Sequence, residues 1–237
     1  MSTTRTRIIL AFFFLINGLC LAGASRADES SPVFWGEARD ADGKLLYREK
    51  HVTSHEGDNI RQSLTIYLDP EGREIARMVS EYDRSLMMPT YVFEDYRRNY
   101  REGLRFENGA YYIFKSDAKR GEVTEPLEES ENVFSCQGWH YYLVRNLDKL
   151  ERDEPLKLQL IFPNKLRHYS FLIERVRSDG ENIRVKLKFA NRLVSWFAPH
   201  LELVYDKKSQ KLIEYSGVSN ILDAKEELQE VFIRYLY

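Results

Sequence analysis

The sequence predicts a mainly β protein, built as an antiparallel curved sheet of about ten strands that forms a half-barrel or a barrel. Three observations support this fold class. Polar and apolar residues alternate along many short runs, turn residues separate these runs at hairpin spacing, and one segment has the apolar spacing of a helix. We expect this single amphipathic helix to pack on the concave side of the sheet, where its apolar face can be buried.

The predicted strands have a period of two. In Leu156–Phe162 the leucines and Phe162 lie on one face, and in Arg184–Phe189 cations alternate with apolar residues. Such alternation buries one face of a strand and leaves the other face in water or in a polar space. The other runs of this kind are Leu45–Val52, Ser63–Leu68, Tyr91–Tyr100, Ala110–Phe114, Tyr169–Val176, Leu201–Tyr205, Leu212–Tyr215 and Val231–Tyr235.

Turn residues join consecutive runs. Asp69–Gly72 reads Asp-Pro-Glu-Gly, which suits a type I turn because proline fixes φ at the second position. The dipeptide Asn108-Gly109 favours a two-residue hairpin loop, in which both residues need a positive φ. Ser178–Gly180 and Asp206–Ser209 have comparable turn compositions. Such short connections predict that neighbours in the sequence are antiparallel neighbours in the sheet.

One segment, Gly138–Leu150, departs from this alternation. Arg145, Asp148 and Lys149 lie away from the apolar stripe of the predicted helix, whereas Asn146 lies near it. The stripe is formed at the spacing of one helix face by Trp139, Leu143, Leu147 and Leu150. We expect a second, shorter helical turn at Asn191–Phe197.

The first 27 residues have the features of an export signal. Two arginines precede an apolar run at Ile8–Ile16, and the small residues Ser25 and Ala27 fit the −3 and −1 positions of a signal-peptidase site. The run is shorter than the roughly 20 apolar residues that a membrane-spanning helix needs. We therefore predict a cleaved signal peptide at 1–27 and a single β-rich domain at 28–237, located in the periplasm.

Cleavage changes the composition of the chain. It removes three arginines and no acid, so the net charge changes from −2 to −5. This charge argues against nucleic acid as a partner, because such binding rests on a basic surface. Cys136 becomes the only cysteine, which excludes an intramolecular disulfide. No stable membrane span is expected after cleavage.

Motifs for metals, cofactors and nucleophiles are incomplete. His51 and His55 are four residues apart, but on a strand their rings would be about 13 Å apart and could not share a metal. The sequence has no glycine-rich phosphate loop, cysteine pair or calcium-type aspartate ladder. Gly217–Ile221 begins like a nucleophile elbow but lacks the closing glycine. We therefore expect no metal and no cofactor, and we assign no catalytic residue.

Polar and aromatic residues suggest a binding site instead. Tyr47, Glu49 and His51 share one strand face and would form a polar patch inside a barrel, although a solvated strand face is the simpler interpretation. The many aromatic residues would line a lipid-binding cavity, stack on sugars or fill the β core. The candidate ligand-binding residues are Tyr47, Glu49, His51, Trp139, Tyr142 and Leu143.

Several short motifs resemble landmarks of an uncharacterised family of exported proteins from Gram-negative bacteria. They are Tyr47-x-Glu49-x-His51, Tyr67-Leu68-Asp69-Pro70-x-Gly72, Phe162-Pro163 and Tyr215-x-Gly217-x-Ser219-Asn220. The resemblance spans most of the mature chain and implies export, but it implies no activity and no catalytic residue. The expected architecture is also loosely similar to the half-barrels that carry lipoproteins through the periplasm, a similarity of fold that does not fix function.

These observations favour a soluble periplasmic binding or chaperone-like module. Its ligand would be a lipid or another apolar molecule held between helix and sheet, and an envelope protein is a second kind of partner that this role would allow. One alternative is an envelope hydrolase that uses Glu49 and His51. Another is a small outer-membrane β-barrel, because Val231–Tyr237 alternates and ends on an aromatic residue.

Overall fold

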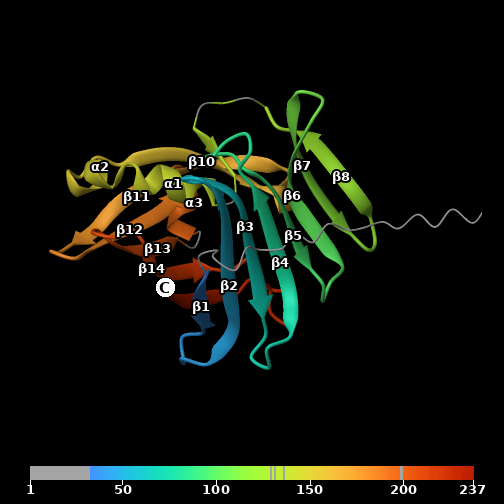
Figure 1. Ribbon diagram of the computed structural model, residues 1–237, viewed down its shortest axis with the longest axis horizontal. Coiled ribbons are helices and arrows are strands. Elements are labelled where there is room, and N and C mark those ends of the chain that lie inside the picture. Colours follow the sequence, from blue (N-terminus) through green and yellow to red (C-terminus); the bar gives the residue numbers. More distant parts are fainter. Residues whose placement is uncertain (1–32, 129, 131, 136, 198–199) are drawn as a thin grey trace, which may run out of the picture.

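The computed structural model describes residues 33–237, except for 129, 131, 136, 198 and 199. Within this part of the chain, fifteen strands form one strongly curved sheet (Figure 1). The mainly β class and the curved antiparallel sheet are thus confirmed. The expectation of about ten strands was wrong, because several strands carry no clear alternation. The sheet is also open, since its edge strands β8 and β9 do not pair with each other.

The elements follow each other closely along the chain. The strands are β1 (Val33–Arg39), β2 (Leu45–Glu56), β3 (Asn59–Leu68), β4 (Glu74–Glu81), β5 (Thr90–Asp95), β6 (Tyr100–Glu107), β7 (Ala110–Asp117), β8 (Gly121–Pro126), β9 (Val133–Phe134), β10 (Leu156–Phe162), β11 (Arg167–Ser178), β12 (Asn182–Phe189), β13 (Leu201–Asp206), β14 (Leu212–Val218) and β15 (Glu230–Leu236). The helices are α1 (Gly138–Val144), α2 (Leu147–Glu151), α3 (Arg192–Phe197) and the 3-10 turn η1 (Pro163–Lys165). None of the helices described is long and apolar enough to cross a membrane.

Two meanders make up the sheet. Strands β1 to β8 form one antiparallel meander and β10 to β15 form the other. The first and the last strand, β1 and β15, pair antiparallel and join the two meanders in the middle of the sheet. The short strand β9 is the exception, because it pairs parallel with β10 through the crossover that contains α1 and α2.

The two ends of the sheet curl toward each other. Ile161 on β10 packs into a cluster with Tyr91, Leu104 and Ile113 from β5, β6 and β7. The turn η1 lies against β6 and β7, where the Lys115 ammonium donates a hydrogen bond of 2.8 Å to a backbone carbonyl of this turn. Side-chain packing therefore brings the two ends together, with no strand pairing between them among the described residues, and this curvature creates an interior.

The predicted turns are present. At Asp69–Gly72 the Gly72 N–H donates to the Asp69 carbonyl over 2.9 Å, and Gly72 has a φ of 85°. Asn108 and Gly109 have φ values of 50° and 84°, as a two-residue hairpin loop requires. The run predicted as one strand at Tyr91–Tyr100 is instead divided by a turn into β5 and β6.

The predicted helix at Gly138–Leu150 is divided into α1 and α2. Asn146, which did not fit the apolar stripe, lies at the break, and its side-chain amide donates to the Tyr142 carbonyl over 2.8 Å. Leu143, Leu147 and Leu150 pack with strands β10 to β13, so the stripe is buried as expected. The expectation of one helix was therefore incomplete, and the short turn near Asn191–Phe197 is present as α3.

Several strands were missed for local reasons. Strand β4 places Ala76 and Ser80 on its buried face and Val79 on the other, so polarity does not alternate. Strand β8 is an exposed, acidic edge strand, so it has no buried face that would produce an alternating pattern. The predicted signal peptide at 1–27 and Cys136 lie outside the described residues.

Candidate functional site

A large cavity occupies the concave side of the sheet. Its volume is about 1300 Å³, larger than the roughly 300–1,000 Å³ of typical small-molecule pockets. Side chains from both meanders and from α1 line it. Its aromatic walls include Phe34, Tyr47, Phe93, Trp139, Tyr169, Phe171, Phe189, Tyr215 and Tyr235. A curved sheet that encloses an aromatic space of this size can accommodate a long apolar molecule.

A short polar chain crosses this apolar wall on β2 and β3. The His51 Nε2 atom lies 2.9 Å from the Glu49 Oε2 atom, and the His51 Nδ1 atom lies 3.1 Å from the Thr65 hydroxyl. The sheet register explains the arrangement, because His51 and Thr65 are directly paired across the two strands. Glu49 is only 5% exposed, so the patch is not a solvated strand face.

A tyrosine from the far end of the chain completes the polar patch. The Tyr235 hydroxyl on β15 donates to the Glu49 Oε2 atom over 3.3 Å, across the intervening strand β1. Gly36 lies between them and is paired with both residues. A Cβ at position 36 would come within 2.9 Å of the Tyr235 ring and 3.2 Å of the Glu49 carboxylate. Glycine at this position therefore allows the two side chains to meet.

Aromatic stacking fixes the orientation of the imidazole. The Phe34 ring lies parallel to His51 at a centroid distance of 4.4 Å, and the Tyr237 ring stacks on Phe34 at 4.7 Å. Tyr235 meets the His51 ring edge-on at 5.8 Å. These contacts hold His51 on both the ring face and the ring edge, so the polar patch is preorganised.

Glu102 is a second carboxylate in the cavity wall, contributed by β6. Burial raises the pKa of Glu102, although the Tyr100 hydroxyl donates to its Oε2 atom over 2.6 Å and favours the charged form. The backbone N–H of Asn164 in η1 also interacts with this carboxylate. Burial likewise raises the pKa of Tyr100 above its ordinary value, and the neighbouring Glu102 charge adds to this shift.

Helix α1 places only one of its three candidate residues, Trp139, in the cavity wall. Trp139, His140 and Tyr141 line the cavity. Tyr142 instead packs against Phe134, with ring centroids 4.7 Å apart, and Leu143 is fully buried in the core behind the helix. Of the six candidate residues, the structure therefore places four in the cavity wall: Tyr47, Glu49, His51 and Trp139.

The loop of residues 219–229, between β14 and β15, contributes Ser219, Asn220 and Leu228 to the cavity wall. Ser219 begins the loop, and its hydroxyl lies 2.7 Å from the Tyr47 hydroxyl and accepts the Ile221 N–H over 2.9 Å. Its position near an incomplete nucleophile elbow is thus explained by a structural role. Burial, the nearby Glu49 charge and other tyrosines raise the pKa of Tyr47, while Ser219 opposes that shift.

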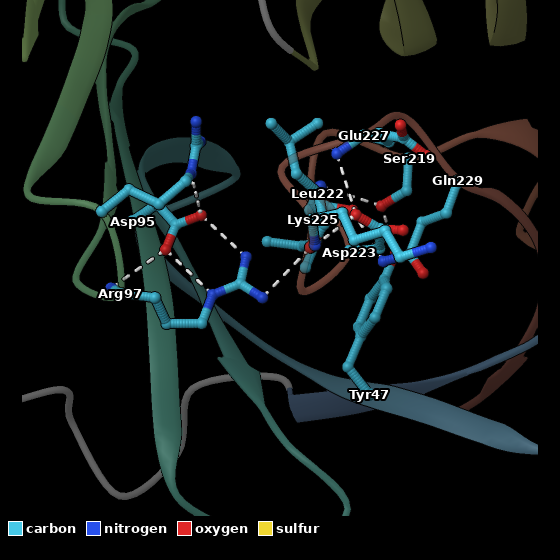
Figure 2. A network of polar contacts seen from close by, with 11 residues as sticks. Tyr47, Asp95, Arg97, Ser219, Leu222, Asp223, Lys225, Glu227 and Gln229 are labelled. Carbon is cyan, nitrogen blue, oxygen red and sulfur yellow. Dashed lines mark hydrogen bonds and ion pairs between the residues drawn. The ribbon is translucent and has the colours of Figure 1, made fainter.

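Figure 2 shows how the 219–229 loop is held from the opposite wall. Asp95 at the end of β5 is fully buried and pairs with Arg97 at 2.7 Å. The same guanidinium donates to the Leu222 carbonyl over 3.1 Å. Within the loop, the Asp223 carboxylate accepts the backbone N–H groups of Lys225 and Glu227, each over 2.8 Å. The loop is therefore an ordered part of the cavity wall.

Sequence reasoning missed several residues of this site. Nothing local indicated that Tyr235, from the last strand, would contact Glu49. Trp139 was a candidate from the sequence, so the helix was expected near the ligand. The neighbouring His140 was not a candidate, because its spacing did not pair it with another histidine. Among the described residues, no group of three or more His, Cys, Asp or Glu side chains is arranged to hold a metal ion.

Comparisons with known proteins concern the fold alone. No protein-family model matches the sequence, and no curated protein does so significantly. The fold is similar to a crystal structure described as a β-barrel-like protein of domain of unknown function DUF1849 from Brucella abortus. The TM-score is 0.51 at 9% sequence identity, and the match covers 86% of this chain and 94% of that chain. The likeness supports the barrel-like architecture predicted from the sequence.

Proposed function

We propose that the protein is a periplasmic binding module that holds a lipid or another long apolar molecule in the concave cavity. The observation that carries this proposal is the aromatic cavity of about 1300 Å³ between the two meanders and α1. Burial of an acyl chain there would remove apolar surface from water on both partners. The chain would occupy space that the side chains of the protein leave unfilled.

The first experiment asks whether the cavity takes up an apolar molecule. Native mass spectrometry and solvent extraction of the purified protein should show a co-purifying lipid. After delipidation, the dye N-phenyl-1-naphthylamine should bind with enhanced fluorescence. A protein that emerges without ligand and leaves this dye unbound would refute the proposal.

A cavity-filling variant makes the test specific. Met78→Trp adds bulk at a half-buried position in the cavity wall and should weaken dye binding about tenfold or more. Val176→Trp is the matched control, because Val176 is 51% exposed and does not line the cavity. Equal losses in both variants, or loss accompanied by a fallen melting temperature, would point to unfolding and not to the cavity.

Periplasmic location is part of the proposal and rests on the N-terminal sequence. Expression of the full chain in a Gram-negative host, followed by osmotic shock, should release a protein whose intact mass corresponds to loss of about the first 27 residues. Retention in the cytoplasm at full mass would contradict this part.

The second candidate is an envelope hydrolase, and one observation favours it. His51 lies between a carboxylate and a hydroxyl, as the base of a catalytic triad does. However, Thr65 is 1% exposed and does not line the cavity, so its hydroxyl is poorly placed to attack a substrate. Assays of ester and cell-wall glycan hydrolysis, with Glu49→Ala and His51→Ala as controls, test this candidate. Turnover that both variants abolish would favour it over simple binding.

A further inference from the structure

The Glu49 carboxylate has one oxygen that the protein leaves available. Its Oε2 atom is hydrogen-bonded to both the His51 Nε2 atom and the Tyr235 hydroxyl. Its Oε1 atom receives no hydrogen bond from any residue that the structure describes, although the side chain is only 7% exposed. Among the described side chains, only Arg105 has a fully buried polar atom without a partner, so Glu49 Oε1 keeps contact with accessible space. The available oxygen belongs to a residue of the cavity wall, where a ligand could supply the missing donor.

The other carboxylate in the cavity has partners of a different kind. Glu102 receives the Tyr100 hydroxyl at 2.6 Å and also interacts with the backbone N–H of Asn164. The charges of Arg98 and Lys115 also act on Glu102, so the protein itself supplies cations near this carboxylate. This difference singles out Glu49 as the place where a polar group of the ligand would be bound.

The surroundings of Glu49 define the chemistry of that group. Tyrosines from three strands gather around the carboxylate, and its charge contributes to raising the pKa of Tyr47, Tyr215 and Tyr235 after the larger effect of burial. Phe34 stacks over the adjacent His51, so the approach to the patch is aromatic. A charged oxygen in such a weakly polar environment interacts strongly with a donor and repels another anion.

We propose that Glu49 binds the head group of the ligand and selects apolar chains that end in a hydrogen-bond donor, a hydroxyl or an ammonium, over chains that end in a carboxylate. This inference rests on the proposed apolar-ligand function and adds a head-group specificity to it. A donor head would complete the coordination of Oε1, and the aromatic wall would contact the chain. A carboxylate head would place two acceptors against each other with no proton between them.

The test uses three molecules with the same chain. Dodecylamine, dodecanol and laurate each displace N-phenyl-1-naphthylamine from the delipidated mature protein, residues 28–237, at pH 7.5, and the loss of dye fluorescence gives their affinities. We expect the amine and the alcohol to bind about tenfold or more tightly than laurate. The amine and alcohol arms show whether the charge of the head group adds to its hydrogen bond.

Two matched variants assign the preference to one carboxylate. Glu49→Gln keeps the size of the side chain but replaces the charge with an amide that also donates, so the preference over laurate should shrink to less than about threefold. Glu102→Gln removes the other cavity carboxylate and should preserve the wild-type preference. Circular dichroism of both variants establishes that they are folded.

The outcomes separate the two proposals. If the dye fails to bind the wild-type protein, the apolar-ligand function is refuted and the head-group inference with it. If the dye binds but the three dodecyl molecules compete equally, the head-group inference alone is overturned. The same holds if Glu49→Gln retains the full preference or if Glu102→Gln loses it.

Discussion

The Nδ1 atom of His140 in α1 lies 2.8 Å from the hydroxyl of Tyr205 on β13, and the two rings stack with centroids 5.5 Å apart. Tyr205 is fully buried, so this hydrogen bond satisfies a hydroxyl that water does not reach. The contact ties the helix to the concave face of the sheet. Because Trp139, the preceding residue, lines the cavity, the same contact also positions part of the cavity wall.

Burial gives His140 a defined effect on stability. It lowers the pKa of His140 to about 4, whereas histidine in an unfolded chain titrates near 6.5. Above pH 6.5 both states are neutral at this residue, so it contributes no pH dependence. As pH falls from 6.5 toward 4, the unfolded chain binds a proton that the folded protein does not, and stability declines.

This decline can be measured by urea unfolding at pH 7.5 and pH 4.5. We expect the wild-type protein to lose about 2–3 kcal/mol more than His140→Gln over this interval, because glutamine does not titrate. The carboxylates contribute equally to both proteins, so the comparison isolates the histidine. Identical pH dependence in wild type and variant would show that His140 does not titrate as burial predicts.

Gly36 provides a second prediction, which concerns packing around Glu49. Gly36→Ala should destabilise the protein by about 1–3 kcal/mol, because the added methyl group would press on the Tyr235 ring and the Ile233 side chain. Gly180→Ala is the control, since an added Cβ there meets no heavy atom within 4 Å, and it should change stability by less than about 0.5 kcal/mol. Thermal and urea unfolding measure both. Equal stability of the two variants would mean that the neighbouring side chains rearrange to accommodate a methyl group at position 36.

Arg97 provides a third prediction, which concerns the 219–229 loop. Arg97→Ala removes the hydrogen bond to the Leu222 carbonyl and should increase amide hydrogen exchange within the loop by about tenfold. Arg98→Ala is the matched control, because Arg98 also pairs with Asp95, at 2.9 Å, but makes no described contact with the loop. It should leave exchange in the loop close to that of the wild type. Similar exchange in both variants would show that Arg97 does not hold the loop.

Much of the fold could be predicted because its contacts are local. Hairpins such as the one at Asn108-Gly109 depend on two turn residues and on the alternation beside them, all of which are visible in the sequence. The helix was identified by its leucine spacing. Its break at Asn146 was marked only by a polar residue that did not fit, and the acidic edge strand β8 had no buried face that would produce a pattern.

The candidate site was predictable only in part. Tyr47, Glu49 and His51 follow one another on a single strand face, so their proximity is a consequence of strand geometry. Tyr235 reaches Glu49 from a strand 186 residues away, and Arg97 reaches Leu222 across 125 residues. No spacing or composition encodes such contacts, because they depend on how the sheet is ordered and curved.

The strand periods, the turns, the amphipathic helix and the polar trio on one strand face each follow from residues close together in the chain, so they can be read without the fold. Long-range packing, in contrast, sets the pairing of the first and last strands, the approach of the two ends of the sheet and the cavity between them. Those outcomes depend on twist accumulated over many strands and on side chains packing from distant segments. The same packing makes Glu49 a buried carboxylate facing the cavity and not a solvated one on the surface.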